Sequence, residues 1–227
     1  MADYKAIKGI GVKSIAGDPT GLTGHVWYDS DANAFQCYRG VGAWAESGDL
    51  NTPRYALGGT GATQSTALAF GGTAPETDVC EEYDGSSWAE SGDLNTARKE
   101  PTGAGTQTAA LAIGGRTPIT GATEEYNGTG WTESGALNTA RMMAGGMGTQ
   151  TAGLCATGHT TPVDASEEYN GASWTEGNEV NTARYHLASL GTQTAGLLAG
   201  GYTTAVKDEC EEYNGTSWVE SGDLGTA

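Results

Sequence analysis

The sequence is poor in basic residues and in histidine. Its 227 residues include 11 Lys and Arg against 28 Asp and Glu, which gives a formal net charge of −17, and only 3 His. A chain of this charge repels the phosphate backbone of nucleic acids and the surface of anionic lipids. We therefore expect no nucleic-acid partner, and we interpret the dispersed acidic residues as a solubilising surface.

Long apolar runs are also missing. No stretch approaches the roughly 20 apolar residues of a membrane helix, and Met1-Ala2-Asp3-Tyr4-Lys5 lacks the apolar core of a signal peptide. We therefore expect no membrane insertion, and synthesis in a cytoplasm without export by a cleaved signal. The hydrophobic fraction of 37% is low, but the 37 glycines account for part of it. Glycine-rich turns and short strands reduce the share of apolar residues without implying disorder, so we interpret the chain as folded.

Residues that typically bind metals are few and scattered. His25, His159 and His186 have no ligand at metal spacing, and the four cysteines show no C-x-x-C spacing. Cys80 and Cys210 occupy the same place in two copies of a repeat, which favours buried thiols in strands over a disulfide between them. We expect no metal and no cofactor.

Two further patterns fail as functional motifs. Asp29-x-Asp31-x-Asn33 begins like a calcium loop, but Ala34 and Gly40 stand where that loop needs Gly and Glu, so a hairpin loop is the better interpretation. No Ser or Thr lies in a nucleophile-elbow context, and no phosphate loop is present. The sequence therefore predicts a protein that is not an enzyme.

The sequence does contain a tandem repeat of 43–44 residues, the period of a repeat architecture. Tryptophan recurs at this spacing, at Trp44, Trp88, Trp131, Trp174 and Trp218. Tyrosine recurs at Tyr83, Tyr126, Tyr169 and Tyr213, and arginine at Arg54, Arg98, Arg141 and Arg184. Each copy also carries a Gly-Thr-Gln-Thr or related tetrad, and three copies close an apolar run with a glycine pair.

One copy is predicted to form four short antiparallel strands. Residues 123–126 favour a strand, Asn127-Gly128 favours a tight primed turn, and residues 131–133 return antiparallel to the first strand. The small residues at 144–148 suit an innermost strand, and the apolar residues at 152–156 a buried one. Four strands in about 43 residues is typical of a β-propeller blade.

We therefore predict an all-β fold with two parts. Residues 1–34 form an N-terminal arm that includes a first strand, and 35–227 form the propeller. The Tyr-to-Trp hairpin occurs five times, but the Arg-to-Gly-Gly half occurs only four times. If Val26-Trp27-Tyr28 supplies an inner strand for the first hairpin, the propeller has five four-stranded blades, which is our prediction. Otherwise an incomplete blade must be completed by the arm or by another subunit.

The repeated side chains are best interpreted as structural. No copy can bury its apolar face alone, so stability must come from stacking of one copy against the next. The repeated Trp and Tyr would provide that packing. The repeated Arg could line a pore or meet an anionic ligand, but its recurrence once per blade favours a tie to a carboxylate of the Glu-Glu-Tyr strand.

The order Arg, apolar strand, Gly-Gly, Glu-x-Tyr, Trp resembles the kelch repeat, with Arg98, Gly114-Gly115, Glu124, Tyr126 and Trp131 as one full set. The resemblance covers 35–227, with a shorter period than is usual for kelch. The third copy departs from it, because Thr157-Gly158 replaces the glycine pair.

The chain is also similar to virion proteins of marine bacteriophages, cyanophages in particular. The phrases that carry this likeness are Leu137-Asn138-Thr139-Ala140-Arg141, Tyr213-Asn214-Gly215-Thr216-Ser217-Trp218 and the opening residues 1–8. The resemblance implies a tail-fibre or spike appendage in the virion, made in the host bacterial cytoplasm, with 1–34 binding other virion proteins. The propeller would bind a host-surface glycan or protein, or a virion subunit. Appendages of this kind are commonly symmetric oligomers, so an incomplete blade would favour a homo-oligomer.

Three alternatives stay open. One is a capsid decoration protein, which the same resemblance allows. Another is a lectin-like module that binds carbohydrate in shallow clefts between blades, lined by Tyr and Trp. The last is a hydrolase or lyase that uses the Glu-Glu pairs, which is disfavoured because those pairs repeat in every blade.

Overall fold

The computed structural model describes residues 14–15, 26–29, 34–37, 46–161 and 163–225. The chain divides into two compact units, Met1–Glu46 and Ser47–Ala227. All the regular structure in the described residues is β-strand, and none of it is helix. The all-β prediction is therefore confirmed.

The Met1–Glu46 unit contains a small sheet. Strand β2 (Val26–Asp29) pairs antiparallel with β3 (Ala34–Cys37), and β1 (Ser14–Ile15) pairs parallel with β2. The hairpin predicted between these two segments is confirmed. His25, the inner part of the Asp29-to-Asn33 loop, Tyr38 and Trp44 lie outside the described residues.

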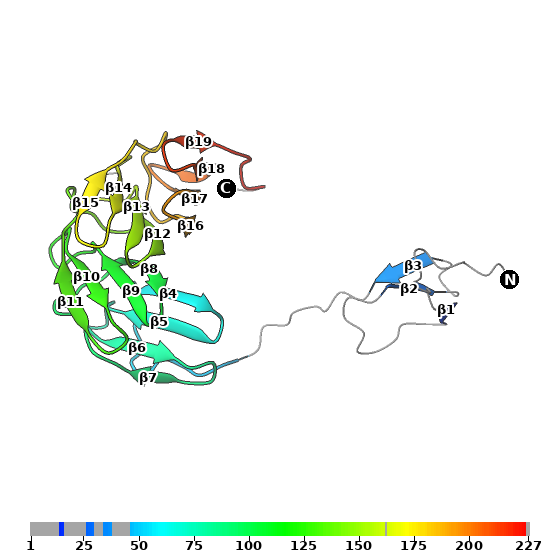
Figure 1. Ribbon diagram of the computed structural model, residues 1–227, viewed down its shortest axis with the longest axis horizontal. Helices are drawn as coiled ribbons and strands as arrows, with labels where there is room; N and C mark the ends of the chain where they lie inside the picture. The colour runs from blue at the N-terminus through cyan, green and yellow to red at the C-terminus, as the bar shows by residue number, and fades with distance from the viewer. Residues whose placement is uncertain (1–13, 16–25, 30–33, 38–45, 162, 226–227) are drawn as a thin grey trace. The chain divides into compact units, whose positions relative to one another are not determined.

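The Ser47–Ala227 unit is a β-propeller of four blades, each a four-stranded antiparallel meander (Figure 1). Blade 1 comprises β4 (Gly58–Thr63), β5 (Thr66–Phe70), β6 (Cys80–Tyr83) and β7 (Trp88–Glu90). Blade 2 comprises β8 (Thr102–Thr106), β9 (Ala109–Ile113), β10 (Thr123–Tyr126) and β11 (Trp131–Ser134). Blade 3 comprises β12 (Gly145–Thr149), β13 (Ala152–Ala156), β14 (Ser166–Tyr169) and β15 (Trp174–Glu176). Blade 4 comprises β16 (Ala188–Thr192), β17 (Ala195–Tyr202), β18 (Val206–Tyr213) and β19 (Trp218–Glu220).

The prediction of five blades is wrong for the described residues, which form four. The Arg-to-Gly-Gly half of the repeat supplies the two inner strands of a blade, and the sequence contains only four copies of it. Only four of the Tyr-to-Trp hairpins can therefore be part of a complete four-stranded blade. Strands β2 and β3, which the five-blade prediction places in the propeller, form a three-stranded sheet with β1 instead.

The four inner strands stack side by side, and the closest approaches among the first three of them require glycine. Strand β4 packs against β8, β8 against β12, and β12 against β16, in chain order (Figure 1). A Cβ atom on Gly103 would lie 2.5 Å from the carbonyl oxygen of Gly59, and one on Gly146 would lie 2.7 Å from that of Gly103. Glycine has no Cβ, so it permits this close backbone approach. All four inner strands line an axial cavity of about 260 Å³, and seven of its twelve lining residues are glycine.

The apolar cores lie between blades. Leu68, Phe70 and Leu94 from the blade 1 segment form one buried cluster with Tyr126 and Trp131 of blade 2. The ring centroids of Phe70 and Trp131 are 5.0 Å apart in an edge-to-face arrangement, which is a favourable geometry for aromatic pairs. Each blade thus contributes half of a core that only its neighbour completes.

The predicted tight turn at Asn127-Gly128 is wrong in detail. Tyr126 pairs with Trp131, so the connection has four residues, and only Gly128 has positive φ, at 90°. The Asn127 side chain explains the difference, because its Oδ1 accepts hydrogen bonds from the backbone of Thr129 at 3.0 Å and of Gly130 at 3.1 Å. Asparagine therefore acts here through its side chain rather than through left-handed backbone.

Candidate functional site

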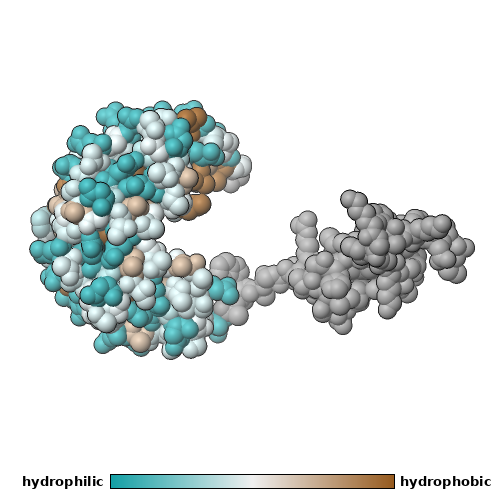
Figure 2. Space-filling view, viewed as in Figure 1, coloured by the Kyte–Doolittle hydropathy of each residue, from teal (hydrophilic) through white to brown (hydrophobic). Residues whose placement is uncertain are grey.

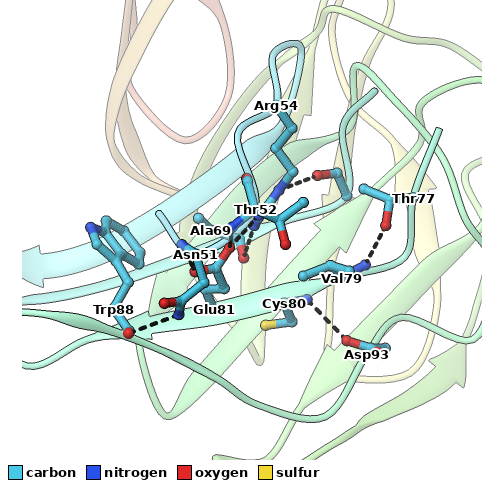
Figure 3. A network of polar contacts seen from close by, with 11 residues as sticks. Asn51, Thr52, Arg54, Ala69, Thr77, Val79, Cys80, Glu81, Trp88 and Asp93 are labelled. Atoms are coloured by element: carbon cyan, nitrogen blue, oxygen red, sulfur yellow. Dashed lines mark hydrogen bonds and ion pairs between the residues drawn. The ribbon is translucent and has the colours of Figure 1, made fainter. Parts of the chain in front are cut away.

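Each blade contains one buried ion pair between the repeated Arg and the first Glu of the Glu-Glu-Tyr triplet. Figure 3 shows the blade 1 pair, Arg54 with Glu81, next to Asn51 and Thr52. In blade 2 the Arg98 Nη2 atom lies 2.8 Å from Glu124 Oε1, and in blade 3 Arg141 Nη1 lies 3.1 Å from Glu167 Oε1. Blade 4 pairs Arg184 with Glu211. The arginines therefore face carboxylates inside the blades and are not free to bind an anion from solvent.

Backbone donors complete the carboxylate sites. The loop that precedes each blade carries an Asn whose N–H donates to the same Glu, as Asn95 does to Glu124 at 2.7 Å. Its side chain also donates to Glu124 and to the carbonyl of Trp131. Burial raises the pKa of the Glu81 carboxyl, but hydrogen bonds from Arg54, Asn51 and Thr52 outweigh burial and hold that pKa below its usual range.

The repeated Tyr and Trp side chains form pairs of tilted rings that are largely buried. Ring centroids of Tyr126 and Trp131 lie 4.9 Å apart, and the pairs in the other blades are similar. In blades 2 to 4 the Tyr hydroxyl donates to the second Glu of the preceding blade, as from Tyr126 to Glu82 at 2.5 Å and from Tyr213 to Glu168 at 2.7 Å. Clefts lined by these aromatics, as the lectin hypothesis requires, are therefore occupied by the neighbouring blade.

Glutamine side chains link adjacent blades as well. Gln107 Nε2 donates to the carbonyls of Ala67 at 3.1 Å and of Tyr83 at 2.6 Å in blade 1. Gln150 and Gln193 make the same two bonds to the preceding blades. The Gly-Thr-Gln-Thr tetrad is visible in the sequence, and the recurrence of its Gln at one spacing was the available signal for this role, which the sequence interpretation missed.

Side chains that differ from blade to blade gather at one end of the sheets. Here an isolated bridge joins the residue after the repeated Arg to a residue beyond, or in blade 4 at, the end of the second strand, and we call this end the variable rim. The four bridges are Tyr55 with Thr73, Lys99 with Arg116, Met142 with His159, and Tyr185 with Tyr202. The repeated positions build the scaffold, so the variable rim is where one blade can differ in chemistry from the next.

The rim of blades 3 and 4 carries an aromatic cluster. Tyr185 packs against His159, Tyr202 and His186, with ring centroids 4.6, 5.6 and 5.4 Å apart. Tyr202 remains 39% exposed, and Tyr55 on the blade 1 rim is 68% exposed. Exposed tyrosines offer both an apolar ring face and a hydroxyl to a ligand. The sequence signal for this cluster was that these aromatics fall outside the repeated positions.

The rim of blade 2 is charged instead. Arg116 Nε lies 2.8 Å from Glu100 Oε2, and a shallow pocket of about 410 Å³ is lined by Glu76, Lys99, Arg116, Thr117, Pro118 and Ile119. Both signs of charge line this pocket. The rim therefore offers an apolar, aromatic region and a mixed-charge region on successive blades.

The remaining candidate residues are dispersed. Cys80, Cys155 and Cys210 are buried free thiols, and burial raises the pKa of the Cys80 thiol to about 12. Within 46–161 and 163–225, no three His, Cys, Asp or Glu side chains gather as a metal site would require. None of the described elements is a helix of the length and apolarity needed to cross a membrane.

Comparison of the chain with models of protein families finds no match, and a search of curated proteins finds none either.

Proposed function

We propose that this chain is a non-enzymatic structural protein of a bacteriophage particle, a tail-fibre or spike appendage with a kelch-like propeller. The variable rim would bind a host-surface glycan or protein, or another virion subunit. The proposal rests on one observation: the repeated side chains and the side chains of the variable rim have different roles. The repeated Arg, Glu, Tyr, Trp and Gln build the blades, whereas the rim presents different exposed groups on the same scaffold.

The phage assignment rests on the resemblance of the repeated phrases and of the N-terminal residues to phage virion proteins. In this proposal residues 1–34 attach the protein to other virion proteins, and the acidic propeller faces solvent. Capsid decoration is the alternative location that the same resemblance supports.

Deletion of residues 1–34 tests the attachment role. We expect the truncated chain to keep the far-ultraviolet circular dichroism of its propeller but to be lost from purified particles. Incorporation of the truncated chain at the normal level would contradict the proposal.

A lectin-like module is the second candidate, favoured by the exposed Tyr55 and Tyr202 on the rim. A glycan array probed with the full chain tests it. Binding that is lost in Tyr202→Ala but kept in Val219→Ala, an exposed site on an outer strand, would support a lectin. Binding unaffected by Tyr202→Ala and Tyr55→Ala would exclude the rim tyrosines as the site.

A further inference from the structure

The three junctions between blades use one set of groups. The earlier blade contributes an inner-strand side chain, a leucine on its second strand and two carbonyls. The later blade contributes a Gln amide and a small residue that receives the leucine. At the junction of blades 3 and 4, Met147 and Leu154 both lie against Gly196, and Gln193 donates to the carbonyls of Gly153 and Tyr169.

Blade 4 presents the earlier half of such a junction, and no described residue of the Ser47–Ala227 unit supplies the later half. Leu190 occupies the inner-strand position that Ala104 and Met147 occupy in blades 2 and 3. The side chain of Leu190 is 57% exposed, whereas those of Ala104 and Met147 are each 3% exposed. Leu197 is partly exposed, although Leu111 and Leu154 at the same place are fully buried. Figure 2 shows hydrophobic surface gathered on this blade.

Within the described residues, the junction-facing polar groups of blade 4 also lack the partners that their equivalents have. Glu212 is exposed, whereas its equivalents Glu82, Glu125 and Glu168 each accept a hydrogen bond from the Tyr hydroxyl of the following blade. In the part of the chain that the structure describes, no Gln donates to the carbonyls of Gly196 and Tyr213.

Blade 1 presents the reciprocal half. Gln64, the equivalent of Gln107, is exposed and has no carbonyl partner within the described ranges. Ala67 stands where Gly153 and Gly196 receive a leucine, and it is partly exposed. The Tyr83 hydroxyl contacts Ser47, but among the described residues it has no carboxylate acceptor of the kind that Tyr126, Tyr169 and Tyr213 have.

We propose that blade 4 of one copy stacks on blade 1 of a second copy and repeats the internal junction between chains. The groups match one to one: Gln64 with the carbonyls of Gly196 and Tyr213, Ala67 with Leu197, and Tyr83 with Glu212. The contact is heterologous, so an open assembly keeps one free face at each end, whereas a closed ring keeps none. This inference does not depend on the proposed function.

One segment must move when the junction forms. Residues 221–225 follow β19 as 47–51 precede blade 1, so both would occupy the same place between the blades. Residues 47–51 are anchored to blade 1 by the hydrogen bond from Asn51 N–H to Glu81. Residues 221–225 are anchored to blade 4 by backbone hydrogen bonds from Ser221 and Leu224 to Cys210 and Asp208 of β18. Leu224 is 45% exposed, so we expect 221–225 to be displaced.

Sedimentation velocity of the full chain tests the proposal from about 1 to about 200 µM. We expect concentration-dependent association, weakened about tenfold or more by Leu190→Glu and by Gln64→Glu, because each puts an unpaired carboxylate into the junction. Val219→Glu is the matched control, since Val219 is 55% exposed on an outer strand and should leave association unchanged. Circular dichroism checks that each variant folds.

Mixing distinguishes this junction from a symmetric one. Leu190→Glu retains a functional blade 1 and Gln64→Glu retains a functional blade 4, so their mixture should form a one-to-one dimer at concentrations where each variant alone is largely monomeric. Absence of that dimer would overturn the proposal, as would a monomeric wild type or a Val219→Glu effect as large as that of Leu190→Glu. Maleimide labelling of the Leu190→Cys variant at the lowest protein concentration is a further test. A thiol that stays unlabelled there would also overturn the proposal, because another part of the same chain would then cover blade 4.

Discussion

Arg141 Nη1 lies 3.1 Å from Glu167 Oε1, and neither side chain is exposed to solvent. The two residues are 26 positions apart in the sequence and join the loop that enters blade 3 to its third strand. Thr139 and Asn138 donate backbone N–H groups to the same carboxylate. The pair therefore fixes the connection between blades as well as the interior of one blade.

Removing one partner of this pair should be strongly destabilising. We expect Arg141→Met to lower the free energy of unfolding by about 3–5 kcal/mol, because it leaves the Glu167 carboxylate buried without its counter-ion. Arg116→Met is the control, since Arg116 is 41% exposed beside Glu100 and should cost at most about 1 kcal/mol. Urea unfolding followed by Trp fluorescence measures both, and equal losses would contradict a special role for the buried pair.

The glutamine clamps provide a second comparison within one chain. Gln150→Ala leaves the carbonyls of Ala110 and Tyr126 without their side-chain donor, so we expect a loss of about 1–3 kcal/mol. Gln64→Ala removes the same side chain from the exposed place in blade 1 and should change the stability of the monomer by less than about 0.5 kcal/mol. Denaturation at low protein concentration tests this, and a similar cost at both positions would argue against clamping.

Stability should fall at alkaline pH because of the inter-blade tyrosines. Burial, followed by the hydrogen bond to Glu125, raises the pKa of Tyr169 to about 12, above the unfolded value of about 10. The unfolded chain therefore loses its proton first, so the stabilisation is complete below pH about 10 and is lost as pH rises through about 12. Urea midpoints at a series of pH values should show this fall, and Tyr169→Phe should reduce its slope. An unchanged slope in Tyr169→Phe would contradict the assignment.

Glycine at the end of the inner strand should be irreplaceable. Gly148 has φ of 97°, and a Cβ there would lie 2.3 Å from the carbonyl oxygen of Ala152. We expect Gly148→Ala to cost about 2–3 kcal/mol through backbone strain and this clash. Gly130→Ala is the control, because a Cβ there meets nothing within 4 Å. Thermal unfolding of the two variants tests the difference, and equal midpoints would show that the inner strand can adjust.

Much of the propeller follows from the repeat. The strand at Thr123–Tyr126 and the buried strand at Ala152–Ala156 lie where hydrophobicity and turn residues predict them. The repeat period also identifies Arg141 and the Glu-Glu-Tyr strand as recurring features of each copy's pattern, but it does not predict which of the two Glu residues forms the ion pair with the arginine. That choice depends on strand alternation, which turns Glu167 inward and Glu168 toward the tyrosine of the next blade.

Other features depend on contacts that periodicity does not encode. The number of blades depends on which strands find partners, and β2 and β3 pair with β1 in the Met1–Glu46 unit. The extra residue of the first copy, visible as a spacing of 44, is absorbed as an irregularity between Gly61 and Thr63. The variable rim departs from the repeat by definition, so periodicity alone does not identify Tyr185 and Tyr202.

Amide hydrogen exchange at low protein concentration tests most directly whether stacking between blades stabilises the propeller. The second strands β5, β9, β13 and β17 are equivalent, but only β9 and β13 have a neighbouring blade on both sides in the described unit. We predict the slowest exchange in β9 and β13, because they open only when two junctions are lost. Equal protection of all four strands would contradict the account, since each blade would then be stable without its neighbours.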